Sequence, residues 1–334
     1  PVQSILSGPA ASVMGVMALA GDLADGCALL FDIGGTTTDI ALFVQGSPVI
    51  DRGGMCLGGR RTLVPALATL SIGVGGDSRI SVEGQGASAS VEVGPLRSGP
   101  AMAFGGKEPT FLDALNVLNS DGTDRKAGNA DASERAMAAL AARCGLETGD
   151  LALRVWKRAV QKISDAAAGL LAGINAHPIY TLRELKSHRD VSADRVYLVG
   201  GPTDCLARRL SASLGLPVVP TAEADVANAV GAALTSPTSS LEIYADTGKG
   251  ELLAPSLDLR EPLENGYSLE SVSERACSLL REHLRSEGVE DVPVEVTEAD
   301  MFATLDDRGY GSKDIRVTCQ AVPGILARVH TEKA

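Results

Sequence analysis

The chain is poor in aromatic side chains, with five Phe, five Tyr and one Trp among 334 residues, so stacking platforms for nucleic-acid bases are not expected. Positive charge is also in short supply: 30 Lys and Arg against 42 Asp and Glu leave a formal net charge of −12. No local run of basic residues offsets this balance, which argues against nucleic acid and anionic membrane surfaces as partners. The most apolar stretch near the beginning, residues 10–20, is too short to span a bilayer.

Cysteine and histidine are too sparse and too scattered to suggest a zinc centre or a disulfide framework. None of the six cysteines belongs to a CxxC pair, and the four histidines form no HExxH motif. A chain of this length without paired cysteines, and with no signal peptide at its beginning, is predicted to be cytoplasmic.

Apolar residues make up 45% of the chain, enough for ordinary cores. Strand and helix patterns alternate along residues 1–238, which predicts an α/β domain. The composition shifts near Pro237, and residues 239–334 are predicted to form a smaller α+β domain. The predicted strands are 27–33, 39–44, 79–83, 89–93, 195–199, 217–219, 241–247, 251–254, 292–296 and 314–320. The predicted helices are 7–20, 133–143, 149–175, 204–214, 223–234 and 268–286, with another after Pro178, and residues 119–132 are predicted to form an exposed loop.

The strongest local signal is FDIGGTTTDI at residues 31–40. One hydrophobic strand enters a Gly-Gly turn and a second leaves it, so successive backbone N–H groups of the loop can point into one concavity and bind anionic oxygens. Gly34 and Gly35 let the backbone approach a ligand without interference from a Cβ atom. Three hydroxyl donors follow directly, at Thr36, Thr37 and Thr38.

Two carboxylates flank this loop. If residues 34–37 form the turn, Asp32 and Asp39 lie opposite each other on the paired strands, where like charges repel. A Mg²⁺ ion with its waters, held beside a bound phosphate, would relieve that repulsion. The alternative interpretation of the same ten residues is a plain β-hairpin whose Asp and Thr side chains satisfy the amides of the turn.

A second signal is VYLVGGPTDCLARRL at residues 196–210. A buried strand ends in Gly200, Gly201 and Pro202 and a helix follows, which is the arrangement of a ligand crevice at the carboxyl end of a strand. The two glycines would admit a flat nucleoside against bare backbone. A tight turn with a helix cap is the alternative, which these residues alone favour.

Two predicted helices, residues 9–20 and 224–235, carry unusually small side chains. Small faces let helices cross at short distance and slide, as an interdomain hinge requires. Ordinary buried helices can have the same composition, so both interpretations stay open.

Together, the hairpin, the Gly-Gly-Pro turn and the two small-sided helices resemble the nucleotide site of the actin, sugar-kinase and heat-shock-chaperone ATPase superfamily. Within it, SGPAASVMG (7–15) followed by FDIGGTTTDI (31–40) is similar to the hydantoinase A/oxoprolinase family. LSIGVGGDSRI (70–80) and VGPLRSGPAMAFGGKEPTFLDALNVL (93–118) agree with that family, as does the C-terminal unit with SKDIRV. The resemblance covers nearly the whole chain and implies an actin-like ATPase (ribonuclease H-like) fold.

The resemblance also implies a chemistry: ATP and Mg²⁺ would serve to hydrolyse cyclic amides related to hydantoin or 5-oxoproline, by phosphorylation of the substrate carbonyl. Asp32 would organise Mg²⁺ and its waters, with Asp39 as the second carboxylate of the metal site. Residues 34–38 would cradle phosphate, and residues 200–202 would bracket the adenosine.

Two departures from the family pattern matter. Family members carry a further domain with another Asp-x-Gly-Gly-Thr hairpin, whereas this sequence has one, so an N-terminal domain or partner subunit is expected to complete the site. The usual Gly-Gly-Gly-Ser stands here as GGDS at residues 75–78, which makes Asp77 a second catalytic candidate facing the substrate. Asp113 is equally well interpreted as a buried helix cap or as a functional carboxylate.

A single hairpin leaves two other functions open for the isolated chain. One is a nucleotide-binding module for assembly or remodelling, driven by closure of the cleft. The other is a non-catalytic scaffold with a vestigial ATP site. The low aromatic content and the Gly-rich segments are compatible with a homo- or hetero-oligomer that buries an interface.

Overall fold

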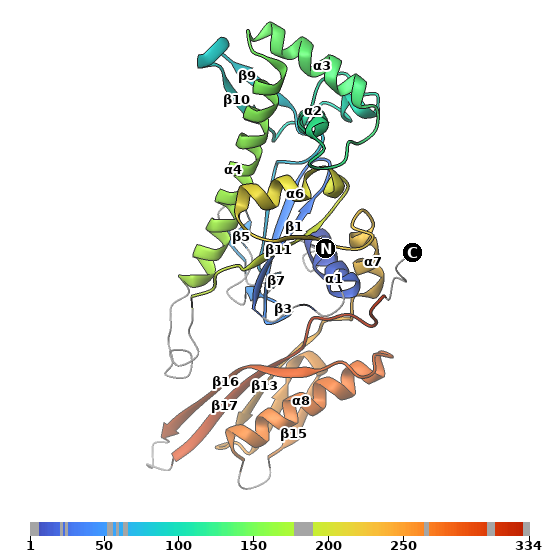
Figure 1. Ribbon diagram of the computed structural model, residues 1–334. Helices are drawn as coiled ribbons and strands as arrows, with labels where there is room; N and C mark the ends of the chain where they lie inside the picture. Colours follow the sequence, from blue (N-terminus) through green and yellow to red (C-terminus); the bar gives the residue numbers. More distant parts are fainter. Residues whose placement is uncertain are drawn as a thin grey trace. The chain divides into compact units, whose positions relative to one another are not determined.

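The computed structural model divides the chain into two compact units, Pro1–Leu234 with Ala327–Ala334, and Thr235–Leu326 (Figure 1). It describes residues 7–20, 23, 26–51, 56–57, 60–62, 66–176, 190–263, 267–305 and 311–329. The predicted helix after Pro178 begins outside the described residues.

The central strand of the larger unit is β1 (Cys27–Ile33), which is apolar and buried along most of its length. It pairs in antiparallel register with β2 (Thr38–Val44) and in parallel register with β11 (Arg195–Val199). A strand that is covered on both faces requires such a near-continuous apolar run. The sheet is completed by β12 (Val218–Pro220) beside β11, and by β3 (Ser47–Pro48) and β8 (Thr69–Ile72) beside β2.

Successive side chains of β1 alternate between two helical layers. Leu29, Phe31 and Ile33 belong to a core shared with α4 (Thr148–Asn175) and α6 (Thr203–Leu214). The opposite face is covered by α1 (Ser7–Leu19), whose Ser12 hydroxyl reaches Asp32. Because side chains along a strand alternate, the even-numbered Asp32 is directed to the α1 side.

Helices α1 and α7 (Ala227–Leu234) pack along each other, and their backbones meet almost directly. A Cβ atom on Gly15 would lie 2.0 Å from the carbonyl oxygen of Ala227, and one on Gly231 would lie 1.8 Å from that of Ala11. Only glycine fits at both positions, so the close approach expected of these small-sided helices is confirmed.

Helix α7 is shorter than predicted, because residues 222–226 form turns instead of helix. Glu223 has a φ of 50°, in the left-handed region that interrupts a right-handed helix. The next carbonyl, that of Ala224, accepts a hydrogen bond of 2.8 Å from the N–H of Gly200. This contact ties the segment before α7 to the carboxyl end of β11.

Helix α2 (Phe111–Leu118) is not among the predicted elements, although the sequence carries its signature. Thr110 and Asp113 form a capping box ahead of the apolar run. Asp113 is fully buried and accepts from the N–H groups of Thr110, Met102 and Ala103 at 2.8–3.0 Å, and from the hydroxyl of Ser133 at 2.6 Å. The structure therefore makes Asp113 a helix cap that also holds residues 102–103.

The segment predicted as an exposed loop at 119–132 is more ordered than expected. Asn119 is buried at the start of a 3₁₀ turn, and α3 already begins at Ala130 and ends at Arg143. The remaining short strands of this unit are β4 (Ile50–Asp51), β5 (Cys56–Leu57), β6 (Arg60–Arg61), β7 (Ala66–Leu67), β9 (Ile80–Glu83) and β10 (Ser90–Val93).

The smaller unit is an antiparallel five-stranded sheet in the order β15-β14-β13-β17-β16, with α8 (Leu269–Ser286) packed on one face. Its core joins Leu241 and Ile243 of the sheet to Val272 and Leu280 of the helix. The α+β character expected of this region is confirmed. The strands are β13 (Ser240–Asp246), β14 (Glu251–Ala254), β15 (Leu259–Pro262), β16 (Val294–Leu305) and β17 (Gly311–Ala321).

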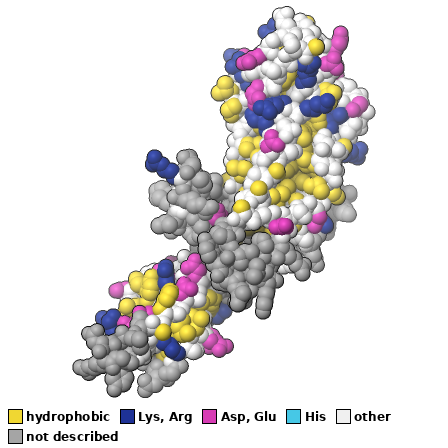
Figure 2. All heavy atoms as spheres, turned by 90° about the vertical axis from the view of Figure 1, so that its left-hand side faces the viewer, with side chains coloured by type: hydrophobic (Ala, Val, Ile, Leu, Met, Phe, Trp, Pro, Cys, Tyr) yellow, Lys and Arg dark blue, Asp and Glu magenta, His cyan; other side chains and the backbone are white. Residues whose placement is uncertain are grey.

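The described surface carries charges of both signs. On the face shown in Figure 2, basic and acidic side chains of the described residues are interspersed, and apolar side chains gather over the middle of the larger unit. Among the residues placed by the structure, no helix combines the length and apolar character needed to cross a membrane.

The crossing of α1 and α7 predicts opposite effects for one substitution at two helical glycines. Gly231→Ala should destabilise the chain by about 3 kcal/mol, because the new methyl group meets the backbone of α1. Gly169→Ala on α4 has nothing within 4 Å of the new Cβ and should stabilise by about 0.5–1 kcal/mol through helix propensity. Urea unfolding of both variants measures the difference, and equal effects would contradict the proposed contact.

Candidate functional site

The turn between β1 and β2 stands at the carboxyl end of the central strand. Asp32 lies opposite Asp39 and Ile33 opposite Thr38, and the turn is closed by a hydrogen bond of 2.9 Å from the N–H of Gly34 to the carbonyl of Thr37. Residues 35–37 are exposed. The predicted hairpin is therefore present, with its tip open to solvent.

At the hairpin tip, two carbonyl groups are hydrogen-bonded to described residues of the protein and three N–H groups are not. The carbonyls of Gly34 and Gly35 accept hydrogen bonds of 2.9 and 2.7 Å from the N–H groups of Gly76 and Asp77. By contrast, no residue placed by the structure accepts from the N–H groups of Gly35, Thr36 and Thr37. Three successive N–H groups without an acceptor in the described chain, in a turn that is exposed to solvent, suit the oxygens of an anion.

The turn that backs the hairpin requires glycine. A Cβ on Gly75 would lie 2.6 Å from the carbonyl carbon of Gly35, so a side chain there would push the two turns apart. Ser78 is buried, and its hydroxyl oxygen accepts from the N–H of Gly75 at 2.8 Å, which holds the turn closed. The GGDS segment thus supports the hairpin from behind.

Asp32 and Asp39 are half-buried carboxylates on neighbouring strands. Burial raises the pKa of Asp32, and the charge of Asp39 adds to this, while the hydrogen bond from Ser12 acts in the opposite direction. Burial likewise raises the pKa of Asp39, against a hydrogen bond from Ser71. A carboxylate pair with raised pKa values gains from a nearby cation.

A metal at this pair would need ligands beyond the protein. No group of three or more His, Cys, Asp or Glu side chains suited to a metal occurs in the described parts of the chain. Two carboxylates beside a turn with unpaired N–H groups suit Mg²⁺, which keeps several waters and is often bound through one or two carboxylates plus phosphate oxygens. The donor set therefore fits that ion.

Not every predicted site residue faces the turn. Thr38 is fully buried, and its hydroxyl donates to the carbonyl of Val74 at 2.7 Å, so it contributes to the packing of the strand. Asp77 does lie at the hairpin tip, with an oxygen 2.8 Å from where a Cβ of Gly35 would stand. Both of its oxygens are occupied, by Arg97 at 2.6 Å and by the N–H of Ala101 at 3.0 Å.

The Gly200–Pro202 turn lies directly beside the hairpin. Gly200 has a φ of 103°, and a Cβ there would lie 2.2 Å from the carbonyl oxygen of Ile33 and 2.9 Å from Oδ1 of Asp32. Gly201 is exposed with open space around it, whereas Pro202 is buried. The structure thus brings the two predicted glycine turns together at the ends of β1 and β11.

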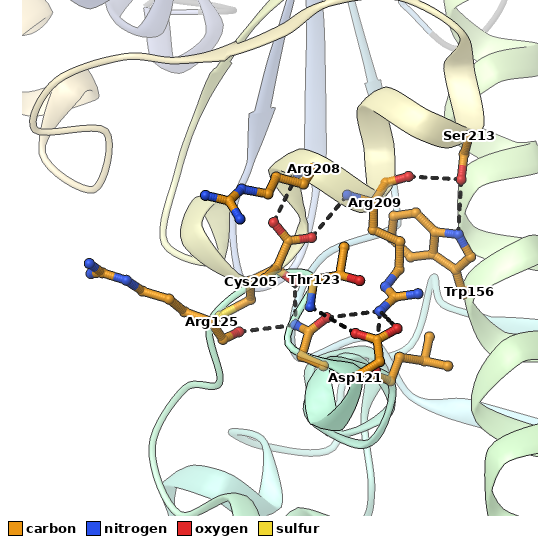
Figure 3. A network of polar contacts seen from close by, with 11 residues as sticks. Asp121, Thr123, Arg125, Trp156, Cys205, Arg208, Arg209 and Ser213 are labelled. Carbon is orange, nitrogen blue, oxygen red and sulfur yellow. Dashed lines mark hydrogen bonds and ion pairs between the residues drawn. The ribbon is translucent and has the colours of Figure 1, made fainter.

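Helix α6, which leaves this turn, is clamped to the loop after α2. Asp124 accepts from the backbone N–H groups of Arg208 and Arg209 at 2.9 Å, and the Arg209 side chain binds Asp121 at 2.7 Å (Figure 3). Hydrogen bonds from Arg209 and Thr123 lower the pKa of Asp121 to about 2. A surface hollow of about 720 Å³ lies beside the clamp, lined by residues 122–125, Asp204, Ala207, Arg208, Ser211, Val218 and Pro220.

Three residues beside the hairpin escaped the sequence analysis. Arg97 pairs with Asp77, Ser12 donates to Asp32, and Asn228 of α7 donates to Ser12. Each acts through a contact between segments 20 or more positions apart, so no local pattern marks it. Of these three residues, only Ser12 has a local feature that suggests a functional role, because it is a polar side chain within the apolar α1.

Comparison with known proteins places this site in context. A family model described as hydantoinase/oxoprolinase matches residues 1–240. The acetophenone carboxylase gamma subunit of Aromatoleum aromaticum is 34% identical in an alignment of length 129 that covers 34% of this chain and 16% of that protein.

Two solved structures share the fold. A nucleotide-free acetone carboxylase has a TM-score of 0.63 at 19% identity, covering 99% of this chain and 51% of that one. The ATP-dependent caprolactamase from Pseudomonas jessenii has a TM-score of 0.54 at 17% identity, covering 98% and 51%. The chain thus spans about half the length of these structures, and a smaller share of the curated relative.

These likenesses confirm the α/β fold class predicted from the sequence, since similarity at such low identity reports on the fold. The family match extends over the whole larger unit up to Leu234, including both glycine turns and the two crossing helices. The chain belongs to the hydantoinase/oxoprolinase family.

Proposed function

We propose that this chain supplies one half of an ATP site in an enzyme that hydrolyses cyclic amides. The observation that carries the proposal is the hairpin tip, where three successive N–H groups are exposed and unpaired beside the carboxylates Asp32 and Asp39. Such a tip suits the phosphate oxygens of a nucleotide, and the adjacent carboxylates suit the cation that accompanies them.

The remaining parts of the site have distinct roles in this proposal. The N–H groups of residues 35–37 bind the phosphates, helped by the hydroxyls of Thr36 and Thr37. Asp32 and Asp39 hold Mg²⁺ through its waters, and that ion would neutralise charge on the phosphates. Gly201, with open space where a Cβ would stand, leaves room for the nucleoside, while Gly200 lets the turn pack directly against the end of β1.

Thr38 and Asp77 have structural roles rather than the ones expected from the sequence. The Thr38 hydroxyl is already engaged inside the protein. Asp77 is held by Arg97, and the pair braces the hairpin from the GGDS side. Arg97 is 45% exposed, so its charge also faces solvent near the tip, where it would favour an anion.

The names of the similar proteins support this substrate class. One is an ATP-dependent caprolactamase, and caprolactam is a cyclic amide; another carries out ATP-dependent acetone carboxylation. In both cases ATP serves a reaction of a carbonyl compound. Amide resonance makes a lactam carbonyl unreactive, and phosphorylation of its oxygen removes that protection.

The proposed reaction balances with two water molecules. The γ-phosphoryl group moves to the carbonyl oxygen as the terminal P–O bond of ATP breaks and ADP leaves. Water then adds to the carbon, and the ring C–N bond opens as the nitrogen takes a proton. Hydrolysis of the remaining acyl phosphate gives a carboxylate and inorganic phosphate.

A second polypeptide segment is part of the proposal. The hairpin offers one wall of a phosphate site, and the chain spans 51% of each of the two similar structures. A curated relative is named as a gamma subunit, hence as part of an assembly. We therefore expect an N-terminal domain or partner subunit to supply the facing wall of the cleft.

The first prediction concerns binding by the chain of residues 1–334. Mg·ADP should bind in isothermal titration, and Asp32→Asn should weaken it by roughly ten- to a hundredfold, because the carboxylate no longer attracts the cation. Asp150→Asn, an exposed position at the start of α4, is the matched control and should bind as the parent does. No binding at millimolar nucleotide, or equal losses in both variants, would contradict the proposed site.

The second prediction concerns turnover by the complete gene product. ADP release should rise at least tenfold on addition of a cyclic amide such as 5-oxoproline, hydantoin or caprolactam, with one ring-opened product per ADP. Coupled assay of ADP and chromatography of the product measure both quantities. Equal ATP turnover with and without each amide would favour the remodelling module, and nucleotide binding without any turnover would favour the scaffold.

A further inference from the structure

A chain of hydrogen bonds connects the two crossing helices to the hairpin carboxylate. The Ser12 hydroxyl on α1 donates to Oδ2 of Asp32 at 2.5 Å, and the side-chain amide of Asn228 on α7 donates to Oγ of Ser12 at 2.8 Å. Ser12 is fully buried, whereas Asn228 is exposed. The contacts link segments that are 20 and 216 residues apart in the sequence.

The distances around Ser12 show that its hydroxyl proton is directed at Asp32. A serine hydroxyl has one proton, and Ser12 has two acceptors in reach: Asp32 at 2.5 Å and the carbonyl of Gly8, four residues earlier in its own helix, at 3.3 Å. Asn228 also donates to the Gly8 carbonyl, at 2.9 Å. Its amide thus occupies one lone pair of that carbonyl and one of Ser12, and the much shorter contact of the hydroxyl with the carboxylate directs its proton at Asp32.

The hydrogen bond from Ser12 gives the two oxygens of Asp32 different surroundings. Oδ2 is committed to Ser12, while Oδ1 lies toward the bare backbone of Gly200, 2.9 Å from where a Cβ would stand there. A carboxylate fixed by one oxygen has one defined rotamer, and its other oxygen has a defined direction. Metal ligands are commonly held in this way by groups that do not touch the metal.

The helix crossing makes this arrangement stiff. Gly15 and Gly231 leave no side chain between α1 and α7, so the backbone that carries Ser12 and the backbone that carries Asn228 are packed directly against each other. No charged residue occurs in α1 or α7, and the charge that acts on Asp32 is that of Asp39 across the hairpin. The alignment of Asp32 therefore depends on neutral hydrogen bonds from the helix pair.

We propose that Ser12 and Asn228 are positioning residues of the nucleotide site, which fix Asp32 so that its second oxygen faces the cation of a bound Mg·nucleotide. This inference rests on the proposed function. It adds that the α1–α7 pair is a functional part of the site, because the helices hold the cation-facing carboxylate through side chains that never contact the ligand.

The test compares Ser12→Ala with Ser133→Ala, a matched control. Ser133 is also fully buried and donates to a carboxylate at 2.6 Å, but that carboxylate is Asp113, away from the hairpin. Affinity for Mg·ADP and for ADP in excess chelator is measured by titration calorimetry for the parent and each variant. Ser12→Ala should weaken Mg·ADP about tenfold and metal-free ADP less than twofold, because the lost contact acts through the cation-facing group.

Asn228→Ala supplies a second route to the same answer. It should weaken Mg·ADP in the same direction but less, and adding it to Ser12→Ala should cause no further loss, since Asn228 acts only through Ser12. Additive losses, or equal loss of Mg·ADP and metal-free ADP in Ser12→Ala, would overturn the positioning role. So would a Ser133→Ala variant that reproduces the metal-specific loss.

A measurement without nucleotide separates this inference from the proposed function. The carboxyl carbon resonance of Asp32, assigned by its loss in Asp32→Asn, is recorded at one fixed pH in the ligand-free chain. It should shift in Ser12→Ala and stay unchanged in Ser133→Ala. If the parent binds no nucleotide, the proposed function fails; if the resonance ignores Ser12→Ala, the positioning inference fails whatever the nucleotide does.

Discussion

The candidate site depends on places where one stretch of backbone touches another with no side chain between them. The hairpin tip rests on Gly75, the strand–helix turn meets the end of β1 at Gly200, and the two crossing helices meet at Gly15 and Gly231. At each of these positions an added Cβ would lie within about 2.6 Å of a backbone atom. Because no side chains separate these segments, the main-chain N–H groups of the hairpin and the carboxylate of Asp32 lie close together at the end of the sheet.

This packing has an electrostatic consequence in an acidic protein. With a net charge of −12, the chain as a whole repels anions. The hairpin compensates locally with main-chain dipoles, because the N–H groups of residues 35–37 have no acceptor in the described part of the chain and the carbonyls of Gly34 and Gly35 are bonded to the turn behind. The repulsion between the paired carboxylates beside it would be relieved by a cation. An anion at the N–H groups and a cation at the carboxylates would therefore each strengthen the binding of the other.

Much of this architecture follows from local sequence patterns. The strands on either side of the hairpin, the glycine turns and helix α1 each have a signature within about ten residues, and each was predicted with nearly correct bounds. Helix α2, which was not predicted, also has a local signature, the capping box at Thr110. Helix α7 was predicted too long because the Ala224 carbonyl is taken by Gly200, a tertiary contact that residue patterns do not contain.

The parts of the site that could not be predicted share one cause. The engagement of Asp77 by Arg97, the burial of the Thr38 hydroxyl and the link from Asn228 to Asp32 all depend on which segments meet in space. A motif identifies residue types that suit a ligand, but it does not tell which of their polar atoms are already engaged inside the fold. Roles carried over from the family pattern therefore survive best for glycines, whose contribution is geometric.

The unpaired N–H groups of residues 35–37 have a consequence for how such proteins diverge. Main-chain amides do not titrate, and most side-chain replacements leave them in place. A related chain could therefore lose the carboxylates while the turn kept its unpaired N–H groups. The presence of such a hairpin therefore indicates common ancestry more reliably than it indicates catalytic activity.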